Sequence, residues 1–227
     1  MRKGELRRQN ILNAAEKLLY TRGYESTSVQ DIIDALGFSK GGFYHHFESK
    51  LALLEAICED RAQRAFALAE RAVSECDGDA VEKLDALFQS ATMLQSDSVD
   101  FISLLLRVAY REDGALMREK MKQQQLLLYL PLMQQIIDEG VAQGDFFTPF
   151  PVEIGEMIMR LSMQLTDEIA FLLAKAKRNP EVLMTIFDKL KLYRHAIEHL
   201  LNAPFGRINI LQLHELEKIC RWMLLQQ

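Results

Sequence analysis

One short segment, SKGGFYHHF at residues 39–47, groups side chains that can bind a phosphate or contact the edge of a base. Lys40 carries a fixed positive charge, and Tyr44 and His45 can each donate a hydrogen bond to a phosphate or base oxygen. If Lys40 stands at the start of a helix, its charge and the unpaired N–H groups of the first turn can hold one phosphate together. The same residue types also occur on the solvated face of an ordinary helical hairpin, so contact with a nucleic acid is one of two interpretations.

Two phenylalanines and two glycines give this segment two different faces. On a helix, Phe43 and Phe47 fall on one side and can join a small core. Gly41 and Gly42 have no Cβ, so a phosphate or a base could approach the backbone closely. The segment therefore predicts a short helix with an apolar inner face and an outer face suited to a phosphate backbone.

The residues before this segment predict a second helix that would hold it in place. Thr27 can cap a helix, and Gln30 stands three residues later, where a capping box needs it. Gly37 suits the left-handed residue that ends a helix, and Ser39 can cap the next one at once. Two amphipathic helices joined by about three residues are typical of a helix-turn-helix. The apolar stripe of the first of these helices consists of Val29, Ile32, Ile33 and Leu36.

The remainder of the chain is also predicted to be helical, because apolar residues recur at spacings of three and four. We expect an all-α protein with a three-helix helix-turn-helix domain over residues 1–49 and a helical ligand-binding and dimerisation domain over residues 50–227. Pro131 should kink the helix that contains it. The expected helices cover 6–21, 27–36, 39–47, 50–75, 80–95, 98–111, 115–142, 152–177, 181–201 and 208–225, the last containing Trp222.

The distribution of charge is compatible with DNA binding at one end of the molecule. The formal net charge of −5 argues at first against a nucleic-acid partner. However, the first 50 residues carry eight Lys/Arg and six Asp/Glu, and the other residues carry 19 and 26. The basic end coincides with the predicted helix-turn-helix.

No stretch reaches the roughly 18 uncharged apolar residues of a membrane span, and the N-terminus lacks the apolar region of a signal peptide. We therefore expect a cytoplasmic protein without a membrane partner. Cys58, Cys76 and Cys220 are odd in number and show no CxxC spacing, which indicates neither a disulfide framework nor a zinc site.

A second group with chemical potential is the pair His195 and His199, spaced as metal ligands on one helix can be, with Glu198 between them. An enzyme is the hypothesis that follows from this pair. No third ligand and no HExxH pattern accompanies it, so we expect neither a metal nor a catalytic site.

The middle of the chain is rich in methionine, with six of the ten between Met117 and Met163. Methionine lines adaptable apolar cavities, but it also fills the cores of helix bundles. A polar residue on these apolar helices, such as Asp167, could hold the polar end of a ligand. The residues expected to bind a largely apolar small molecule are Phe66, Phe101, Leu105, Tyr110, Met121, Tyr129, Met133, Met163 and Asp167.

A stripe with alternating spacings of three and four runs along residues 181–201, and a similar stripe precedes it within 152–177. Two such helices from each of two copies could form a four-helix bundle, which predicts a homodimer. Alternatively, both stripes pack within one subunit. The residues assigned to the dimer seam are Ile158, Leu161, Leu165, Leu183, Ile186, Leu190, Tyr193, Ile197 and Leu200.

The run from Ile11 to Ile57 resembles the N-terminal DNA-binding domain of the TetR family nearly position by position. The resemblance covers about a fifth of the chain. It is carried by Gly23-Tyr24, Thr27, Val29, Ile32, Gly37, Ser39-Lys40-Gly41, Tyr44-His45-His46-Phe47 and Lys50.

This resemblance implies that the helix after Ser39 enters the major groove of DNA. It further implies that Tyr44 and Lys50 contact phosphates and that Thr27 anchors the start of the preceding helix to the DNA backbone. Gly42 stands where the family often has a larger or hydroxyl-bearing residue. The implied DNA-contacting set is Thr27, Ser28, Ser39, Lys40, Gly41, Gly42, Tyr44, His45 and Lys50.

The resemblance also implies a homodimeric regulator without a cofactor, most simply a repressor that a small molecule releases from double-stranded operator DNA. The alternative is a DNA-binding adaptor that responds to a protein partner and has no small-molecule effector. With a small-molecule effector, we expect the long helix over 50–75 to carry the signal to the DNA-binding residues.

Overall fold

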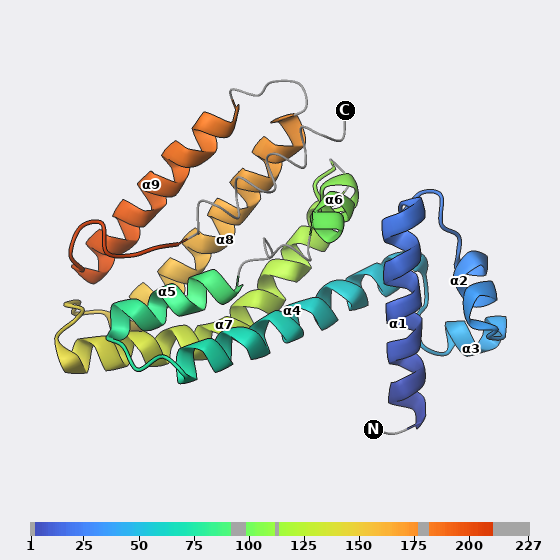
Figure 1. Ribbon diagram of the computed structural model, residues 1–227, viewed down its shortest axis with the longest axis horizontal. Helices are drawn as coiled ribbons and strands as arrows, with labels where there is room; N and C mark the ends of the chain where they lie inside the picture. Colours follow the sequence, from blue (N-terminus) through green and yellow to red (C-terminus); the bar gives the residue numbers. More distant parts are fainter. Residues whose placement is uncertain (1–2, 92–98, 112–113, 177–181, 211–227) are drawn as a thin grey trace.

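The computed structural model describes residues 3–91, 99–111, 114–176 and 182–210, and within these ranges all regular secondary structure is helical. The prediction of an all-α protein is confirmed. Figure 1 shows two unequal parts: α1, α2 and α3 at one end, and α5 to α9 at the other, with α4 running between them. The helices are α1 (Lys3–Arg22), α2 (Val29–Leu36), α3 (Lys40–Tyr44), α4 (Lys50–Ser74), α5 (Ala80–Ala91), α6 (Val99–Val108), α7 (Ala115–Gln143), α8 (Pro151–Ala176) and α9 (Val182–Leu201).

The helix-turn-helix forms as the sequence predicts at its turn, but with a different cap at its start. Gly37 has a φ of 63°, the left-handed conformation that ends α2. Ser28, not Thr27, is the N-cap of α2, because its side chain accepts a hydrogen bond from the Asp31 N–H and Asp31 completes the capping box. The capping box predicted from Thr27 and Gln30 is therefore wrong.

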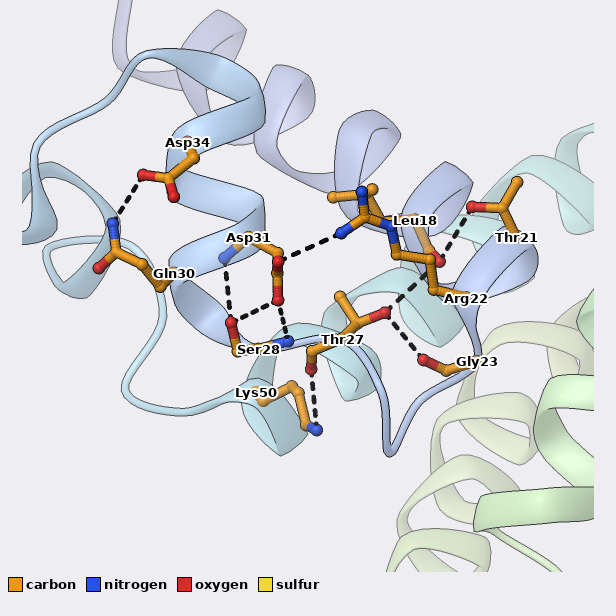
Figure 2. A network of polar contacts seen from close by, with 10 residues as sticks. All are labelled: Leu18, Thr21, Arg22, Gly23, Thr27, Ser28, Gln30, Asp31, Asp34 and Lys50. Atoms are coloured by element: carbon orange, nitrogen blue, oxygen red, sulfur yellow. Dashed lines mark hydrogen bonds and ion pairs between the residues drawn. The ribbon is translucent and has the colours of Figure 1, made fainter.

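Thr27 has a different role, because its side chain is fully buried. Its hydroxyl donates a hydrogen bond to the carbonyl oxygen of Gly23 at 2.8 Å (Figure 2). This bond fixes the turn between α1 and α2, and burial leaves the Thr27 side chain no room to serve as an exposed cap.

A single apolar core holds α1, α2 and α3 against the first half of α4. The same core includes Phe101, Leu104, Leu105 and Ala109 from α6 and its end, together with Met117 from α7. We call this cluster the head core. It extends well beyond residue 49, so a division of the chain at that residue separates elements that share one core.

The second core lies among α4, α5, α7, α8 and α9. Pro131 lies inside α7 without ending it, and α7 continues to Gln143. Of the predicted helix over 208–225, residues 208–210 are not helical, and the rest, with Trp222, lies outside the described residues.

One close approach in this second core explains a glycine inside a helix. A Cβ added to Gly140 would lie 2.3 Å from a ring carbon of the buried Phe146 and 2.8 Å from the Cβ of Ala80. The missing side chain thus allows α7 to approach both α5 and the loop that follows α7.

We predict that Gly140→Ala lowers the free energy of unfolding by about 1–3 kcal/mol, because the added methyl group overpacks a filled core. Urea denaturation followed by circular dichroism measures this change. Gly4→Ala is the control, since Gly4 lies in α1 with open space around it. Equal stability of both variants would contradict the packing argument.

Candidate nucleic-acid interface and internal cavity

The start of α3 is built around Ser39, whose hydroxyl accepts a hydrogen bond from the Gly42 N–H at 3.1 Å. A Cβ on Gly42 would lie 3.2 Å from the Ser39 hydroxyl oxygen, whereas a Cβ on Gly41 would meet open space. Gly42 therefore belongs to the local packing of the cap. Gly41 leaves the outer surface of the helix open to an approaching group.

The two faces of α3 separate as the sequence predicts. Phe43 and Phe47 are buried in the head core, and their rings lie 5.9 Å apart between centroids. Lys40 and His45 are exposed, and Tyr44 is 45% exposed. Ser39 is exposed beside them. The polar side chains of this segment that are predicted to contact DNA are thus open to solvent, while its two phenylalanines are not.

Two arginines of α1 add positive charge that the sequence analysis did not assign. Arg8 lies 5.5 Å from the ring centroid of Phe47. The pKa of His46 is lowered, first by partial desolvation and then by the positive charges of His45, Arg7 and Arg8. Only the folded structure brings these residues together, because Arg7 and Arg8 lie more than 30 positions before His46 and Phe47 in the sequence.

Lys50 has a definite structural role at the first turn of α4. Its ammonium donates hydrogen bonds to the carbonyl oxygens of Tyr24 at 2.8 Å and Thr27 at 3.0 Å, the second of which Figure 2 shows. It also lies 4.2 Å from the ring centroid of Tyr24. An ammonium group has three N–H donors, so two of them hold the turn before α2 and one is left for a phosphate.

The cavity of the C-terminal part has a volume of about 150 Å³ and a predominantly apolar lining. Of the nine predicted ligand-binding residues, Leu105, Tyr110, Tyr129, Met133 and Met163 line it. The remaining lining residues are Leu87, Phe88, Ile102, Leu106, Gln125, Met159, Ser162, Leu165, Thr166, Ile169, Ala170, Leu173, Leu190 and Ile210.

The other four predicted ligand-binding residues, Phe66, Phe101, Met121 and Asp167, do not line the cavity. Phe101 and Met121 pack in the head core, on the side of α6 and α7 that faces α1 to α4. Phe66 contacts the ring of Tyr129 edge-on, with 5.1 Å between centroids. Asp167 is buried, accepts a hydrogen bond from the Tyr110 hydroxyl at 3.0 Å and pairs with Lys122.

The residues assigned to a dimer seam lie mostly inside the chain itself. Six of them are buried in the second core, namely Ile158, Leu165, Ile186, Leu190, Tyr193 and Ile197. Leu161 and Leu200 are partly buried against the same core, and the side chain of Leu183 lies outside the described residues. Within one chain, α8 and α9 cover each other's apolar stripes, so these six residues are buried without a second copy. Their assignment to a surface between subunits stays a prediction.

The histidine pair does not build a metal site within the described ranges. His195 and His199 are exposed with their rings 6.0 Å apart. Glu198 is buried and accepts a hydrogen bond from the Ile208 N–H at 3.2 Å. No group of three His, Cys, Asp or Glu suited to a metal ion occurs among the described residues.

Cys58 and Cys76 are free thiols, and Cys220 lies outside the described residues. In the parts of the chain that the structure covers, no helix has both the length and the apolar character that a membrane crossing requires.

Comparison with known proteins places the N-terminal part among regulators. Residues 11–57 match the family described as "Bacterial regulatory proteins, tetR family". The chain is 26% identical over 158 residues to the HTH-type transcriptional repressor KstR2 of Mycolicibacterium smegmatis, covering 65% of this chain and 71% of that protein. It is 29% identical over 136 residues to the HTH-type transcriptional regulator UidR of Escherichia coli, covering 60% of this chain and 63% of that protein.

Solved structures share the whole fold. A TetR-family transcriptional regulator of Pectobacterium atrosepticum superposes with a TM-score of 0.64 at 20% identity, over 89% of this chain and 97% of that one. The fatty acid degradation regulator FadR of Bacillus halodurans superposes with a TM-score of 0.58 at 19% identity, over 85% and 96%. The likeness therefore extends from the helix-turn-helix into the C-terminal helices.

Replacing two lysines separates a phosphate contact from a structural contact. We predict that Lys40→Ala and Lys50→Ala both weaken binding to all DNA sequences alike, because phosphate contacts carry no sequence information. Each should lower the slope of log K against log salt by about one unit. Only Lys50→Ala should also lower the melting temperature, because only Lys50 holds the carbonyl groups of Tyr24 and Thr27.

Fluorescence anisotropy of labelled duplex DNA at several salt concentrations, with thermal unfolding in parallel, measures both effects. A salt slope that is unchanged in Lys50→Ala, alongside a lowered melting temperature, would restrict Lys50 to its structural role.

Proposed function

We propose, since the chain belongs to the TetR family of DNA-binding transcriptional regulators, that it is a cytoplasmic homodimeric repressor released from its operator by a small molecule. As a member of this family the chain is a regulator and not an enzyme. The observation that carries the proposal is the position of α6, which belongs both to the head core and to the cavity wall.

Leu105 of α6 shows this double position most directly. It is buried in the head core with Phe101 and Leu104, and it also lines the cavity. Ile102 and Leu106 line the cavity from the same helix. A molecule that enters the cavity therefore contacts a helix whose other face packs against the DNA-binding elements.

Charged contacts strengthen the connection between α6 and the DNA-binding part of the chain, which α1, α2 and α3 form; below we call this part the head. Arg61 of α4 lies 4.4 Å from the ring centroid of Phe101, pairs with Glu16 and donates a hydrogen bond to the Tyr20 hydroxyl at 3.0 Å. Arg111, just after α6, pairs with Glu25 at 3.1 Å. A shift of α6 would have to move or break these contacts, so α6 joins α4 as a second route to the head.

A ligand shifts the DNA-bound population only by the difference between its affinities for the two conformations. We infer that a molecule in the cavity displaces α6 and tilts the DNA-binding part formed by α1, α2 and α3. In a dimer, this tilt changes the distance between the two recognition helices. A coupling of about 1–3 kcal/mol is typical of such systems. The cavity favours a small molecule over a protein partner as the effector, because its apolar lining comes from α5 to α9 inside the helical part and its volume suits a small molecule.

For DNA, we propose that α3 enters the major groove and that Ser39, Lys40, Gly41, Tyr44 and His45 contact phosphates or bases. All five residues are exposed, at the N-cap, within and at the C-cap of α3. Arg7 and Arg8 extend the same positive surface, and Thr27, Ser28 and Gly42 contribute through the backbone turns that they fix. Lys50 contributes its remaining N–H donor.

For the dimer, we propose the outward faces of α8 and α9 in place of their buried stripes. Leu192 and Met184 of α9 are 61% and 66% exposed, and Met157 of α8 is 49% exposed. Regulators of this family typically dimerise, and two heads are needed to occupy two half-sites of a near-palindromic operator.

The release mechanism is tested with a panel of small neutral and charged organic molecules. Compounds that raise the melting temperature of the protein are added to its complex with the DNA upstream of its own gene. We expect a subset to release the DNA from wild-type protein. The DNA affinity of Ala170→Phe, which fills the cavity, should no longer depend on these compounds.

Ala174→Phe is the matched control, because Ala174 lies one turn later on α8, is exposed and does not line the cavity. It should respond like wild type. Release of DNA from Ala170→Phe at the same compound concentrations as from Ala174→Phe would contradict the proposal.

The dimer surface is tested by placing a charge on it. We predict that Leu192→Glu yields monomers in sedimentation velocity at micromolar concentration and weakens operator binding by at least about tenfold, because one head holds one half-site. Leu127→Glu on α7, where the leucine is 79% exposed, is the control and should remain dimeric. A dimeric Leu192→Glu variant would exclude this surface.

A further inference from the structure

The hydroxyl of Tyr129 is a polar group of the cavity that no described residue of the protein satisfies. The side chain is 3% exposed and lines the cavity from α7. No hydrogen bond joins this hydroxyl to any residue that the structure describes, and burial alone raises the pKa of Tyr129 to about 12. Phe66 packs edge-on against its ring and holds the ring in place.

The buried side-chain atoms that lack a hydrogen-bond partner in the described residues do not include the Tyr129 oxygen, so this hydroxyl is accessible from the cavity that Tyr129 lines. Its hydrogen bond must therefore go to water or to a ligand in the cavity. The Gln125 amide lines the cavity one helical turn before Tyr129, on the same face of α7. These two groups can bind one polar end of a ligand together.

Two further hydroxyl groups of the lining, those of Ser162 and Thr166, already donate their protons within the protein, so toward a ligand they can act as hydrogen-bond acceptors. Ser162 donates its proton to the Ile158 carbonyl oxygen at 2.8 Å, and Thr166 donates to the Ser162 carbonyl oxygen at 3.0 Å. Their lone pairs can accept a bond from a ligand hydroxyl. The lining therefore offers a donor at Tyr129, an amide at Gln125 and acceptors at Ser162 and Thr166.

Charge in and near the cavity disfavours an anionic ligand. None of the described lining residues is charged. Nearby, the buried Asp167 carboxylate is held by Lys122 and by the Tyr110 hydroxyl, which itself lines the cavity. An anion would lose its hydration without gaining a free cation, and Asp167 would repel it.

The size of the cavity limits the ligand further. About 150 Å³ of mainly apolar space is comparable with an engineered protein cavity that binds benzene. One six-membered ring with a short substituent fills such a space.

We propose that the effector is a neutral, mainly apolar molecule of about one ring, with a carbonyl or hydroxyl oxygen that accepts a hydrogen bond from Tyr129. This inference rests on the proposed function, because it names the chemistry of the molecule that would release the DNA. It excludes carboxylates as the preferred effectors.

Three probes of nearly equal shape test this chemistry: acetophenone, which is neutral and has a carbonyl oxygen, isopropylbenzene, which has no oxygen, and benzoate, which is an anion. Their dissociation constants are measured by NMR titration of the full chain without DNA. Wild-type protein should bind acetophenone at least about tenfold more tightly than benzoate, because an unpaired charge is costly to bury.

The variant Tyr129→Phe removes only the hydroxyl. It should weaken acetophenone binding about two- to tenfold, the range of one hydrogen bond, and leave isopropylbenzene binding within about twofold. Tyr193→Phe is the matched control, since its hydroxyl bonds to Glu168 at 3.1 Å and Tyr193 does not line the cavity.

Tighter binding of benzoate than of acetophenone, or no binding of any probe, would overturn the inference. An unchanged preference for acetophenone over isopropylbenzene in Tyr129→Phe would overturn the role of Tyr129. These titrations contain no DNA, so they test the ligand chemistry separately from the release mechanism. If acetophenone binds but does not release the operator DNA, the release mechanism is wrong. If benzoate binds more tightly and releases the DNA, the ligand chemistry is wrong and the proposed function still holds.

Discussion

The burial of α6 between two apolar cores is the constraint on which the rest of the structure depends. Phe101 and Leu104 close the head core, while Ile102 and Leu106 form part of the cavity wall, and Leu105 takes part in both. A helix of ten residues cannot move one of its faces without the other. Because protein interiors are densely packed, we propose that a change in the content of the cavity would shift the helix.

Electrostatics divides the molecule in a similar way. The chain has a net charge of −5, yet the surface around α3 combines Lys40 and His45 with Arg7 and Arg8 from α1. An acidic body with a basic end orients the molecule toward a polyanion, and the body is repelled by it. The cavity, by contrast, has no charge among its described lining residues, so the chemistry of the two proposed sites suits opposite kinds of partner.

Different atoms of Tyr129 serve the core and the cavity. The ring packs edge-on against Phe66 and belongs to the second core, whereas the hydroxyl has no hydrogen-bond partner among the described residues and is accessible from the cavity. In the proposed mechanism, this hydroxyl is the group that recognises the polar atom of the effector.

The sequence by itself determined the helices, the left-handed turn at Gly37 and the inward orientation of Phe43 and Phe47, because periodicity and turn residues act locally. Tertiary structure alone decided which neighbour each apolar face meets. The stripe containing Ile186 and Ile197 is covered by the chain's own α8, and Phe101 faces the head while Tyr129 faces the cavity. The N-cap of α2 is Ser28, whereas the sequence predicted Thr27. Only the packed turn shows that the Thr27 side chain is buried and donates its hydrogen bond to Gly23. Helical spacing identifies the residues that share a face, but the surface that covers that face is set by contacts between residues far apart in the chain.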